Sequence, residues 1–599
     1  MTRLKISALV MVLLGQCLLV GPAFSLDVLT LNLAGKNAEL KEDLRAVSLL
    51  SGAKRDNITR PQEIWAAANA DYGRILGALY ERGFYGGVVR IQLDGQEAGL
   101  VTPFSIPTKF KSAVINVNTG PQFVFGTTRI APTAAGTQLP VGFARGAVAR
   151  SGVVQEAVET VIDQWRNNGF AKATPADQQF IADHVAQTLS VRVSIEPGPK
   201  VLFGKLQLQD NIAVRPDRIR RMAGLPTGEV FSPAVLDDVA SRLRRSGAFR
   251  SVALSEGDVT APDNRMDIEL ELVDEKPRRF GFGGEVSSLE GLTVSGFWMH
   301  RNFFGGAERL RIYGEIASIG GETGGVDYKL GARIEQPAAF GVDTKSYLRG
   351  ELAELDEPNF RSRQAEIGLG AVWLPKEFLE FEGGVAFRYS EVEDDLGQRK
   401  FRLMTLPLSA TVDRRDDALD ASKGAYLNAV FLPFLDLDGT NSGGRLLLDG
   451  RGYYSPGKDK QIVLAGRLQF GAVVGPNIEN IPPDYLFYSG GGGIVRGQPY
   501  QSLDVDLGGG DKSGGRSFVA LSGEARVRTG KKFSVVGFYD AGYIGAESTF
   551  DGSGDWHAGA GLGLRYDTAI GPIRFDVAAP VSGRTGSGAQ IYVGIGQAF

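Results

Sequence analysis

Cysteine is nearly absent from this 599-residue chain: the one residue of this type, Cys17, lies within the first 25 residues. Without a second cysteine the chain has no intrachain disulfide and no cysteine-ligated metal site. Long apolar runs are also missing beyond residue 25, where no stretch approaches the roughly 18 apolar residues of a spanning helix. Positive charge is not in excess, because the net charge is −4 and the pI is about 5.8. This balance argues against a nucleic-acid partner.

Catalytic signatures are equally scarce. The three histidines are far apart in the sequence, so each is expected to be structural. The glycine run Gly490–Gly493 suggests a phosphate loop, but the G-x-G-x-x-G spacing fails because Val495 and Arg496 stand where the last glycine is needed. No G-x-x-x-x-G-K-[ST] motif is present. We therefore expect no enzyme activity, no cofactor and no metal site.

Residues 1–25 are predicted to be a secretory signal peptide. Two basic residues begin this segment, Ile6–Val20 is apolar, and Ala23–Ser25 offers a cleavage site with small residues. A transmembrane anchor is the alternative, but the apolar stretch is short and Gln16 interrupts it. The prediction places the rest of the chain beyond the inner membrane.

Glycine marks a boundary near residue 280, since 56 of the 80 glycines follow it. Before that boundary the chain repeats. Pro121, Pro199 and Pro277 stand in three similar sequences, TGPQFVFG, PGPKVLFG and EKPRRFGFG, and successive prolines are 78 residues apart. Self-similarity at a fixed period predicts one structural module that is used several times.

Each repeat is predicted to be a small α+β domain in which one strand precedes two helices and two strands follow them. Helices end at Gly83, Gly169 and Gly247, because glycine just past a helix closes it. The domains are expected at residues 26–119, 120–197 and 198–276. This order resembles the POTRA domain, a periplasmic polypeptide-binding module, although a generic α+β repeat with a structural role is the alternative. The segments carrying the pattern are Val28–Leu33, Phe123–Ile130, Leu202–Leu208, Ser251–Glu256 and Arg265–Leu272 as strands, and Ile64–Arg82, Val153–Asn167 and Pro233–Arg245 as helices.

From residue 277 onward, apolar and polar side chains alternate in segments of about ten residues. In LSGEARVR, Leu521 and Val527 share one face, whereas Glu524 and Arg526 share the other. A soluble sandwich would alternate in the same way, but the signal-like start, the many glycines and the lack of a spanning helix favour a membrane barrel. At about 20 residues per strand and connection, residues 277–599 predict a 16-stranded antiparallel transmembrane β-barrel.

Four motifs in the barrel carry a resemblance to a known superfamily. They are WMHRNFFGGAE (Trp298–Glu308), DRRDDALDASKGAYL (Asp413–Leu427), IVRGQPY (Ile494–Tyr500) and GFYDAG (Gly537–Gly542). In this order, after POTRA-like repeats, they resemble the outer-membrane assembly and transport superfamily that includes BamA and TamA, and three modules before the barrel resemble its TamA branch. Ala421 stands where proline is usual, and Gln498–Pro499 separate the arginine motif from its usual aromatic residue.

The resemblance implies an arginine loop folded into the barrel lumen. Strand alternation places Asp540 and Glu524 on the lumen side, and the family's loop would bring Arg496 and Gly497 to them. A guanidinium and a carboxylate fit as a bidentate pair. In a partly dehydrated lumen, removing one partner would cost roughly 3–5 kcal/mol, because the other charge is left stranded. A solvated arginine on an extracellular loop is the alternative.

The resemblance also implies a lateral gate where the first strand, Phe280–Val286, meets the last, Gln590–Phe599. Glycine weakens a strand interior, and exposed strand edges could template incoming strands by β-augmentation. Relief of side-chain crowding is the alternative role for these glycines. The last strand further resembles a β-signal, with Gln597 at a position that is usually hydrophobic. The expected gate residues are Gly281, Gly283, Gly284, Gly594, Gly596 and Phe599.

These features predict an outer-membrane assembly factor of a Gram-negative bacterium that inserts or translocates β-barrel or autotransporter-type proteins. Its N-terminal domains would lie in the periplasm. The expected partners are unfolded outer-membrane protein clients, outer-membrane lipids and, by resemblance alone, a TamB-like periplasmic protein that docks on the first module. The alternative is a conduit: a secretion pore of the two-partner type, or a solute channel with periplasmic adaptor domains.

Overall fold

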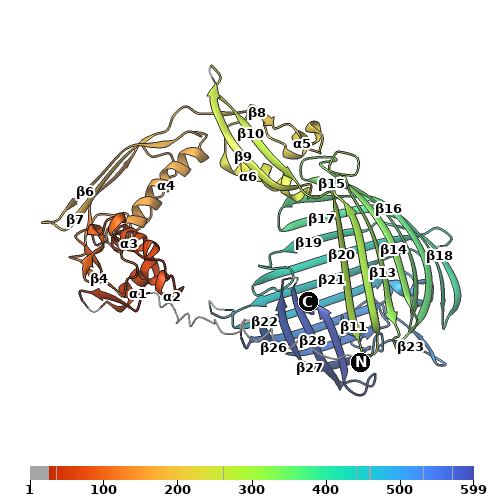
Figure 1. Cartoon of the computed structure of the whole chain (residues 1–599). Helices are drawn as coiled ribbons and strands as arrows, with labels where there is room; N and C mark the ends of the chain where they lie inside the picture. The colour runs from red at the N-terminus through yellow and green to blue at the C-terminus, as the bar shows by residue number, and fades with distance from the viewer. Residues whose placement is uncertain are drawn as a thin grey trace, which may run out of the picture. The chain divides into compact units, whose positions relative to one another are not determined.

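The structure is a computed structural model that describes residues 26–599, apart from residues 36, 261, 440, 458–459, 531 and 570. The predicted signal peptide, residues 1–25, lies outside the described residues. The chain divides into two compact units. The first holds the residues up to Phe203 with two short later segments, and the second holds most of residues 204–258 and all of 267–599 (Figure 1).

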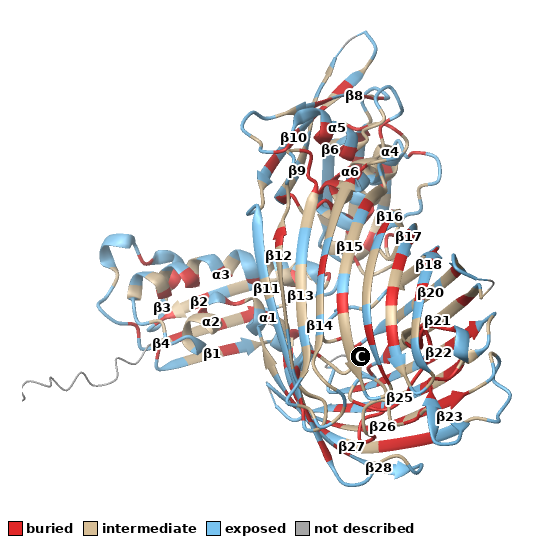
Figure 2. Cartoon of the chain, turned by 90° about the vertical axis from the view of Figure 1, so that its right-hand side faces the viewer, coloured by how far each residue is buried: buried red, intermediate tan, exposed pale blue. Residues whose placement is uncertain are grey.

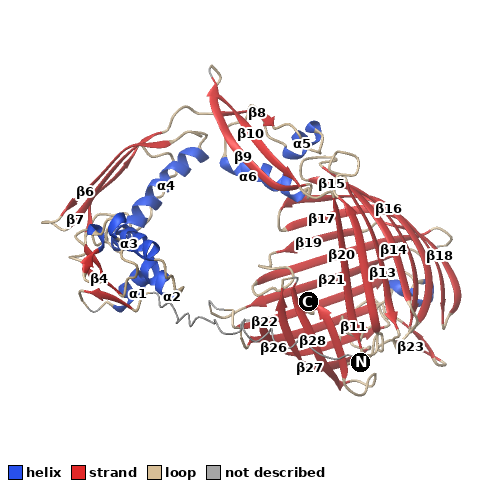
Figure 3. Ribbon diagram, viewed as in Figure 1, coloured by secondary structure: helices blue, strands red, loops and turns tan. Residues whose placement is uncertain are grey.

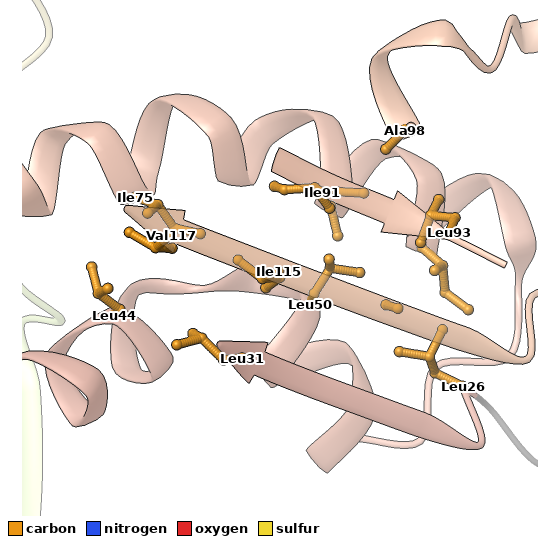
Figure 4. Close-up of a cluster of buried hydrophobic side chains, with 14 of the residues drawn as sticks. Leu26, Leu31, Leu44, Leu50, Ile75, Ile91, Leu93, Ala98, Ile115 and Val117 are labelled. Carbon is orange, nitrogen blue, oxygen red and sulfur yellow. The ribbon is translucent and has the colours of Figure 1, made fainter. Parts of the chain in front are cut away.

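The first module belongs to the first unit and is a four-stranded sheet with three helices. The strand order is β1-β4-β2-β3, and β1 runs parallel to β4. Leu31, Ile75 and Ile115 are buried in the core between the helices and the sheet (Figure 4). The elements are β1 (Val28–Leu33), α1 (Ala38–Val47), α2 (Leu49–Arg55), α3 (Pro61–Glu81), β2 (Val88–Leu93), β3 (Gln96–Glu97) and β4 (Ser112–Asn118), with short 3-10 turns at Ala98–Leu100 and Pro103–Ser105.

Local sequence explains where these helices begin and end. Proline occupies the first position of α3, Pro61, where its missing N–H costs nothing. The buried carboxylate of Asp71 accepts hydrogen bonds from the backbone N–H groups of Leu49 and Leu50, at 2.7 and 3.1 Å. These bonds cap the start of α2. Just beyond α3, Gly83 adopts φ +82°, as the glycine stop predicts.

The second module has the strand order β5-β7-β6, with β5 parallel to β7. Among its described residues α4 is the single α-helix, so the expectation of two helices is wrong for this module. Residues 132–150, where another helix would lie, contain two prolines and three glycines, which disfavour helix. The elements are β5 (Val124–Ala131), α4 (Ser151–Asn167), β6 (Thr174–Asp183) and β7 (Thr188–Glu196).

The third module has the strand order β8-β10-β9. In the second unit its α6 meets the barrel, because Arg242 Nε and Arg245 Nη2 donate to Asp343 Oδ1 at 3.0 and 2.8 Å. Across the described residues, no helix combines the length and apolar character needed to span a membrane. The elements are β8 (Leu202–Leu208), α5 (Pro216–Ala223), α6 (Pro233–Arg245), β9 (Phe249–Thr260) and β10 (Arg265–Asp274).

A closed antiparallel barrel follows, built from strands (Figure 3). Its segments are β11 (Arg278–Ser287), β12 (Gly291–His300), β13 (Arg309–Ile319), β14 (Asp327–Pro337), β15 (Thr344–Glu357), β16 (Phe360–Lys376), β17 (Leu379–Asp394), β18 (Gly397–Thr405), β19 (Leu408–Asp413), β20 (Gly424–Asp436), β21 (Gly443–Tyr454), β22 (Ile462–Val474), β25 (Ser517–Arg528), β26 (Phe533–Gly545), β27 (Asp555–Thr568), β28 (Gly571–Ser582) and β29 (Gln590–Ile595). Segments β18 and β19 both pair with β17 and β20, so they form one strand interrupted near Pro407. The described residues therefore form sixteen barrel strands, which confirms the predicted fold.

On strands such as β22, β26 and β28 the two faces differ as the alternation predicts. On β28, Ile573 and Phe575 are exposed on the outer face, whereas Arg574 and Asp576 are buried on the inner face. Buried, intermediate and exposed residues follow one another along strands such as β16 and β17 in Figure 2. Strand β11 follows β10 directly, so it begins at the end of the barrel next to the third module, which we call the module end. It finishes at the opposite end, which we call the loop end.

The last strand is shorter than predicted. It ends at Ile595 rather than Phe599, because Gly596 adopts φ +96°, which turns the chain out of the extended conformation. As a result, β11 pairs with β12 at ten positions but with β29 at only two, Val286 with Val593 and Ser287 with Tyr592. The barrel is closed at the loop end of this seam, while Arg278–Glu285 have no partner among the described residues of β29.

Candidate functional site

The predicted arginine lies in the connection between β22 and β25, residues 475–516, at the loop end of the barrel. The connection contains short 3-10 turns at Ile478–Asn480 and Pro483–Tyr485 and a hairpin of β23 (Val505–Gly508) with β24 (Asp511–Ser513). Gly497, at φ +93°, approaches β28 so closely that an added Cβ would lie 2.8 Å from the backbone of Ala579. Only glycine can occupy this position without displacing that backbone.

Arg496 is buried and held by carboxylates on neighbouring strands. Its Nε and Nη2 donate to Asp540 Oδ2 and Oδ1 at 2.7 and 3.0 Å, which is a bidentate pair. Its Nη1 donates to Glu524 Oε1 at 2.7 Å. The guanidinium also lies 3.6 Å from the ring centroid of Phe538, a cation–π contact. The structure thus brings together Arg496, Asp540 and Glu524, the residues that the sequence predicted for this loop.

Three more charged residues complete the cluster, and they were not among the site residues predicted from the sequence. Arg526 Nε donates to Glu524 Oε2 at 2.8 Å, and Arg565 Nη2 donates to Asp576 Oδ2 at 3.3 Å. Asp576 Oδ2 lies 3.4 Å from Arg496 Nη1. Three guanidiniums therefore face three carboxylates, so the buried cluster is neutral. Strand alternation was the signal that could have identified these residues, because it places Arg526 on the same face as Glu524.

The arginine loop is also hydrogen-bonded to both sides of the barrel seam. On the β29 side, Gly497 N–H donates to Tyr592 Oη at 3.0 Å, and Gln590 Nε2 donates to the Gly497 carbonyl at 3.1 Å. On the β11 side, Gly492 N–H donates to Glu290 Oε1 at 2.8 Å, in the turn between β11 and β12. Burial raises the pKa of Glu290, and the bond from Gly492 opposes that rise. The seating of the loop is therefore linked to the closure of the seam.

Side chains reinforce the short backbone pairing at the seam. Ser288 N–H donates to the Ile591 carbonyl at 3.0 Å, and Ile591 N–H donates to Ser288 Oγ at 3.1 Å. Across the seam, Arg574 of β28 pairs with Glu285 of β11. Gly594 leaves room for this arginine, because a Cβ there would lie 3.0 Å from Arg574 Nε.

The other predicted gate glycines have different surroundings. At Gly281 an added Cβ would lie 2.2 Å from the ring of Phe297, and at Gly283 it would lie 2.8 Å from Ser295 Oγ. These two glycines therefore leave space for side chains of β12, the crowding role that the sequence left open. A Cβ at Gly284 would meet only the Thr293 carbonyl, at 3.8 Å.

Phe599 is not at the seam. After Gly596 the chain turns into the lumen, where Phe599 packs with Ala421, Tyr453 and Ala465. Gln597 donates to Asp420 Oδ1 at 2.9 Å and accepts from Arg565 Nε at 3.0 Å. Polar partners inside the barrel explain why glutamine occupies a position that the β-signal pattern makes hydrophobic.

Comparison with known proteins identifies the barrel. Residues 302–599 match the Omp85 superfamily domain. This chain carries an Omp85 barrel. A curated relative, the outer membrane protein assembly factor BamA of Nitratidesulfovibrio vulgaris, is 23% identical over 459 residues, which cover 72% of this chain and 55% of the relative. The chain thus spans about half the length of this relative.

One solved structure shows the same fold over most of the chain. The structure of BamA from Haemophilus ducreyi lacking POTRA domains 1–3 is similar over 79% of this chain and all of that chain, with a TM-score of 0.62 and 16% identity. CdiB from Acinetobacter baumannii is similar over 80% of this chain and 90% of its own, with a TM-score of 0.49 and 12% identity. The predicted resemblance to the superfamily that includes BamA and TamA is confirmed for the barrel, as is the architecture of POTRA-like α+β domains followed by a 16-stranded barrel.

Proposed function

We propose that the chain is an outer-membrane assembly factor that inserts β-barrel or autotransporter-type proteins through a lateral gate between β11 and β29. Its POTRA-like modules lie in the periplasm, where they receive unfolded clients or a TamB-like partner, as in the TamA branch of the superfamily. No catalytic step is involved, since client folding into lipid supplies the driving force. The Omp85 domain and the assembly-factor relative support this assignment.

The proposal rests on the short seam between β11 and β29, where the two strands pair at only two positions. Adjacent strands elsewhere in the barrel pair over longer stretches, for example at fourteen positions between β15 and β16. At the seam, Arg278–Glu285 of β11 present backbone groups that β29 does not satisfy. Such an edge is a template on which an incoming strand can pair. Parting the seam also breaks fewer backbone hydrogen bonds than parting any long strand pair.

A groove on the second module supports the client-receiving role of the N-terminal domains. A cavity of about 560 Å³ lies between α4 and β6, with Val154, Val158 and Phe180 in its lining. Strand β6 is at the edge of its sheet, so its outer backbone groups can pair with an extended chain. Phe180 and Ile181 are about half exposed, at 51% and 49%, which gives such a chain apolar contacts.

A disulfide lock across the seam tests the gate. We would introduce cysteines at Val286 and Val593, which face each other in the register, and follow assembly of a β-barrel client in proteoliposomes. Cysteine is otherwise confined to Cys17, so the pair can be oxidised selectively. Loss of assembly on oxidation, with recovery on reduction and no effect in either single variant, supports insertion through the seam. Full assembly or transport by the oxidised protein excludes the lateral gate and favours the conduit.

A further inference from the structure

We propose that the outward face of β11–β17 binds a phosphorylated glycolipid, with its acyl chains in an apolar groove beside the seam and its phosphate on Arg361 and Arg363. Two adjoining cavities form this site. An apolar one of about 800 Å³ extends from β11 to β17, and a polar one of about 400 Å³ lies at its loop end. Arg363 and Glu391 line both cavities, so together the two have the shape of an amphiphile.

Strand register explains why the groove exists. Phe282, Gly296, Gly314, Leu330 and Leu352 are successive neighbours in one row across five strands. The two glycines have no side chain, so the wall is hollow between the large apolar residues on either side. Phe282 and Leu352 are 87% and 58% exposed on this outer face. An exposed apolar hollow of this kind on a membrane barrel suits an acyl chain.

Charged side chains at the loop end form the second half of the site. Arg361 Nη2 and Arg363 Nε donate to the same atom, Glu354 Oε1, at 2.8 and 3.1 Å. Each guanidinium has five N–H donors, so this carboxylate orients both arginines while leaving donors directed to solvent. Their side chains are 50% and 66% exposed. Two fixed guanidinium forks of this kind match the oxygens of a phosphate.

Carboxylates near Arg361 and Arg363 indicate which other chemical groups the lipid head group should bring. Lys400 pairs with Glu391 at 2.7 Å, and Asp356 lies 4.0 Å from Arg361. Glu393 and Arg399 also line the polar cavity, so with Glu354 four carboxylates accompany four cations. These carboxylates already accept from the neighbouring cations, but each has further acceptor sites. A simple phosphate monoester brings no donor to those sites, whereas a phosphorylated sugar brings hydroxyl groups to them. The chemistry therefore favours a phosphorylated glycolipid over a lipid whose head group is phosphate alone.

Lipid A combines phosphates, sugar hydroxyls and acyl chains, and its choice as probe rests on the proposed outer-membrane location. Binding to the purified full chain in detergent micelles would be measured by native mass spectrometry, with no client present. Failure of binding and failure of client assembly are therefore separate results. Binding of four ligands would be compared: lipid A, dephosphorylated lipid A, phosphatidylethanolamine and inorganic phosphate.

Two kinds of variant separate the head-group and acyl-chain contacts. We expect Arg361→Gln with Arg363→Gln to weaken lipid A binding about tenfold or more, with dephosphorylated lipid A little changed. Replacing both arginines with lysine should restore only part of that loss, because lysine keeps the charge but lacks the fork. Gly314→Val fills the floor of the groove and should weaken both glycolipids equally. A Cβ at Gly314 lies 3.5 Å from the Lys329 carbonyl, so the valine fits the strand.

Matched controls lie outside both cavities. Arg402→Gln removes an arginine that pairs with Asp438 at 3.1 Å, and Gly523→Val adds a side chain where nothing lies within 4 Å. Heat-modifiable migration on gels shows that each variant has folded. Equal affinity for phosphorylated and dephosphorylated lipid A, equal losses in the control variants, or tighter binding of phosphatidylethanolamine would each overturn the proposal. Saturable binding of inorganic phosphate alone would overturn it too, by showing an anion site without a lipid.

Discussion

Replacing Arg496 with glutamine tests whether the luminal cluster fixes the arginine loop. The substitution removes one of three guanidiniums that face three carboxylates, so one negative charge is left uncompensated in a buried site. Arg496 donates two hydrogen bonds to Asp540 and one to Glu524, all at 3.0 Å or less. Breaking a buried pair in this way costs about 3–5 kcal/mol. We expect the free energy of unfolding in lipid vesicles to fall by that amount, measured by urea titration with tryptophan fluorescence.

A second readout separates loop release from general damage. In the Arg496→Gln protein, residues 475–516 should become sensitive to protease under native conditions, because the loop loses its buried anchor. Adding Asp540→Asn removes the opposite charge, so the double variant should be more stable than the sum of the two single losses predicts, by at least about 1.5 kcal/mol.

A lumen-facing pair elsewhere serves as the control. Arg349 donates to Glu366 at 2.7 Å, but their side chains remain 30% and 25% exposed. Partly solvated pairs contribute about 1 kcal/mol or less, so Arg349→Gln should have a small effect and leave the loop protected. Equal, small losses in the Arg349 and Arg496 variants, with a protected loop in both, would refute the anchoring role of the buried cluster.

Three further predictions concern the seam and its surroundings. Glu290→Gln should raise the free energy of unfolding by about 1 kcal/mol at neutral pH, because it removes the cost of burying a charge. Since burial raises the pKa of Glu290 in the folded protein, the wild type should lose stability as pH rises through that pKa, whereas the variant should not, and urea titration of both proteins at several pH values would show the difference. Asp343→Ala should weaken the contact between the third module and the barrel by about 1–2 kcal/mol, because Arg242 and Arg245 on α6 lose the carboxylate that they share. The distribution of spin-label distances between module and barrel should broaden. Gly596→Ala places a side chain at φ +96°, which costs about 1 kcal/mol or more, so the residues after it should leave the lumen and exchange their amide protons faster.

Much of the barrel could be predicted because its strands follow a simple rule. Outward residues must be apolar in lipid, and inward residues are polar, so alternation gives both the strands and their faces. The same rule placed Asp540 and Glu524 in the lumen. The partner of these carboxylates came from resemblance, because a loop of four glycines carries no periodicity from which its path could be inferred.

Other features depended on interactions that single-sequence patterns do not encode. The end of the last strand is set by one backbone angle at Gly596, in a segment whose apolar alternation is interrupted at Gln597 but includes the last residue, Phe599. The inward path of Gln597 is stabilised by Asp420, a residue 177 positions away in the sequence. The lipid groove likewise arises from register, since Gly296 and Gly314 are neighbours only once β12 and β13 are paired.

The inward turn after Gly596 decides where the seam is weak. If the last strand continued in register beyond Val593, Ile595 would lie opposite Gly284, and the residues after it would cover more of the β11 edge. Instead Gln597 and Phe599 bind inside the lumen, and the module end of β11 lacks a partner among the described residues of β29. Backbone groups that face hydrocarbon without a partner cost several kcal/mol each, so this edge favours any strand that can pair with it.

Opening should therefore begin at the module end and proceed toward the two pairs at the loop end. A disulfide between cysteines at positions 284 and 595 tests this order: it should form only if the last strand straightens, and it should then prevent client assembly as fully as a lock at 286 and 593. Assembly that survives the first lock but not the second would show that the module end stays closed during insertion, contrary to this argument.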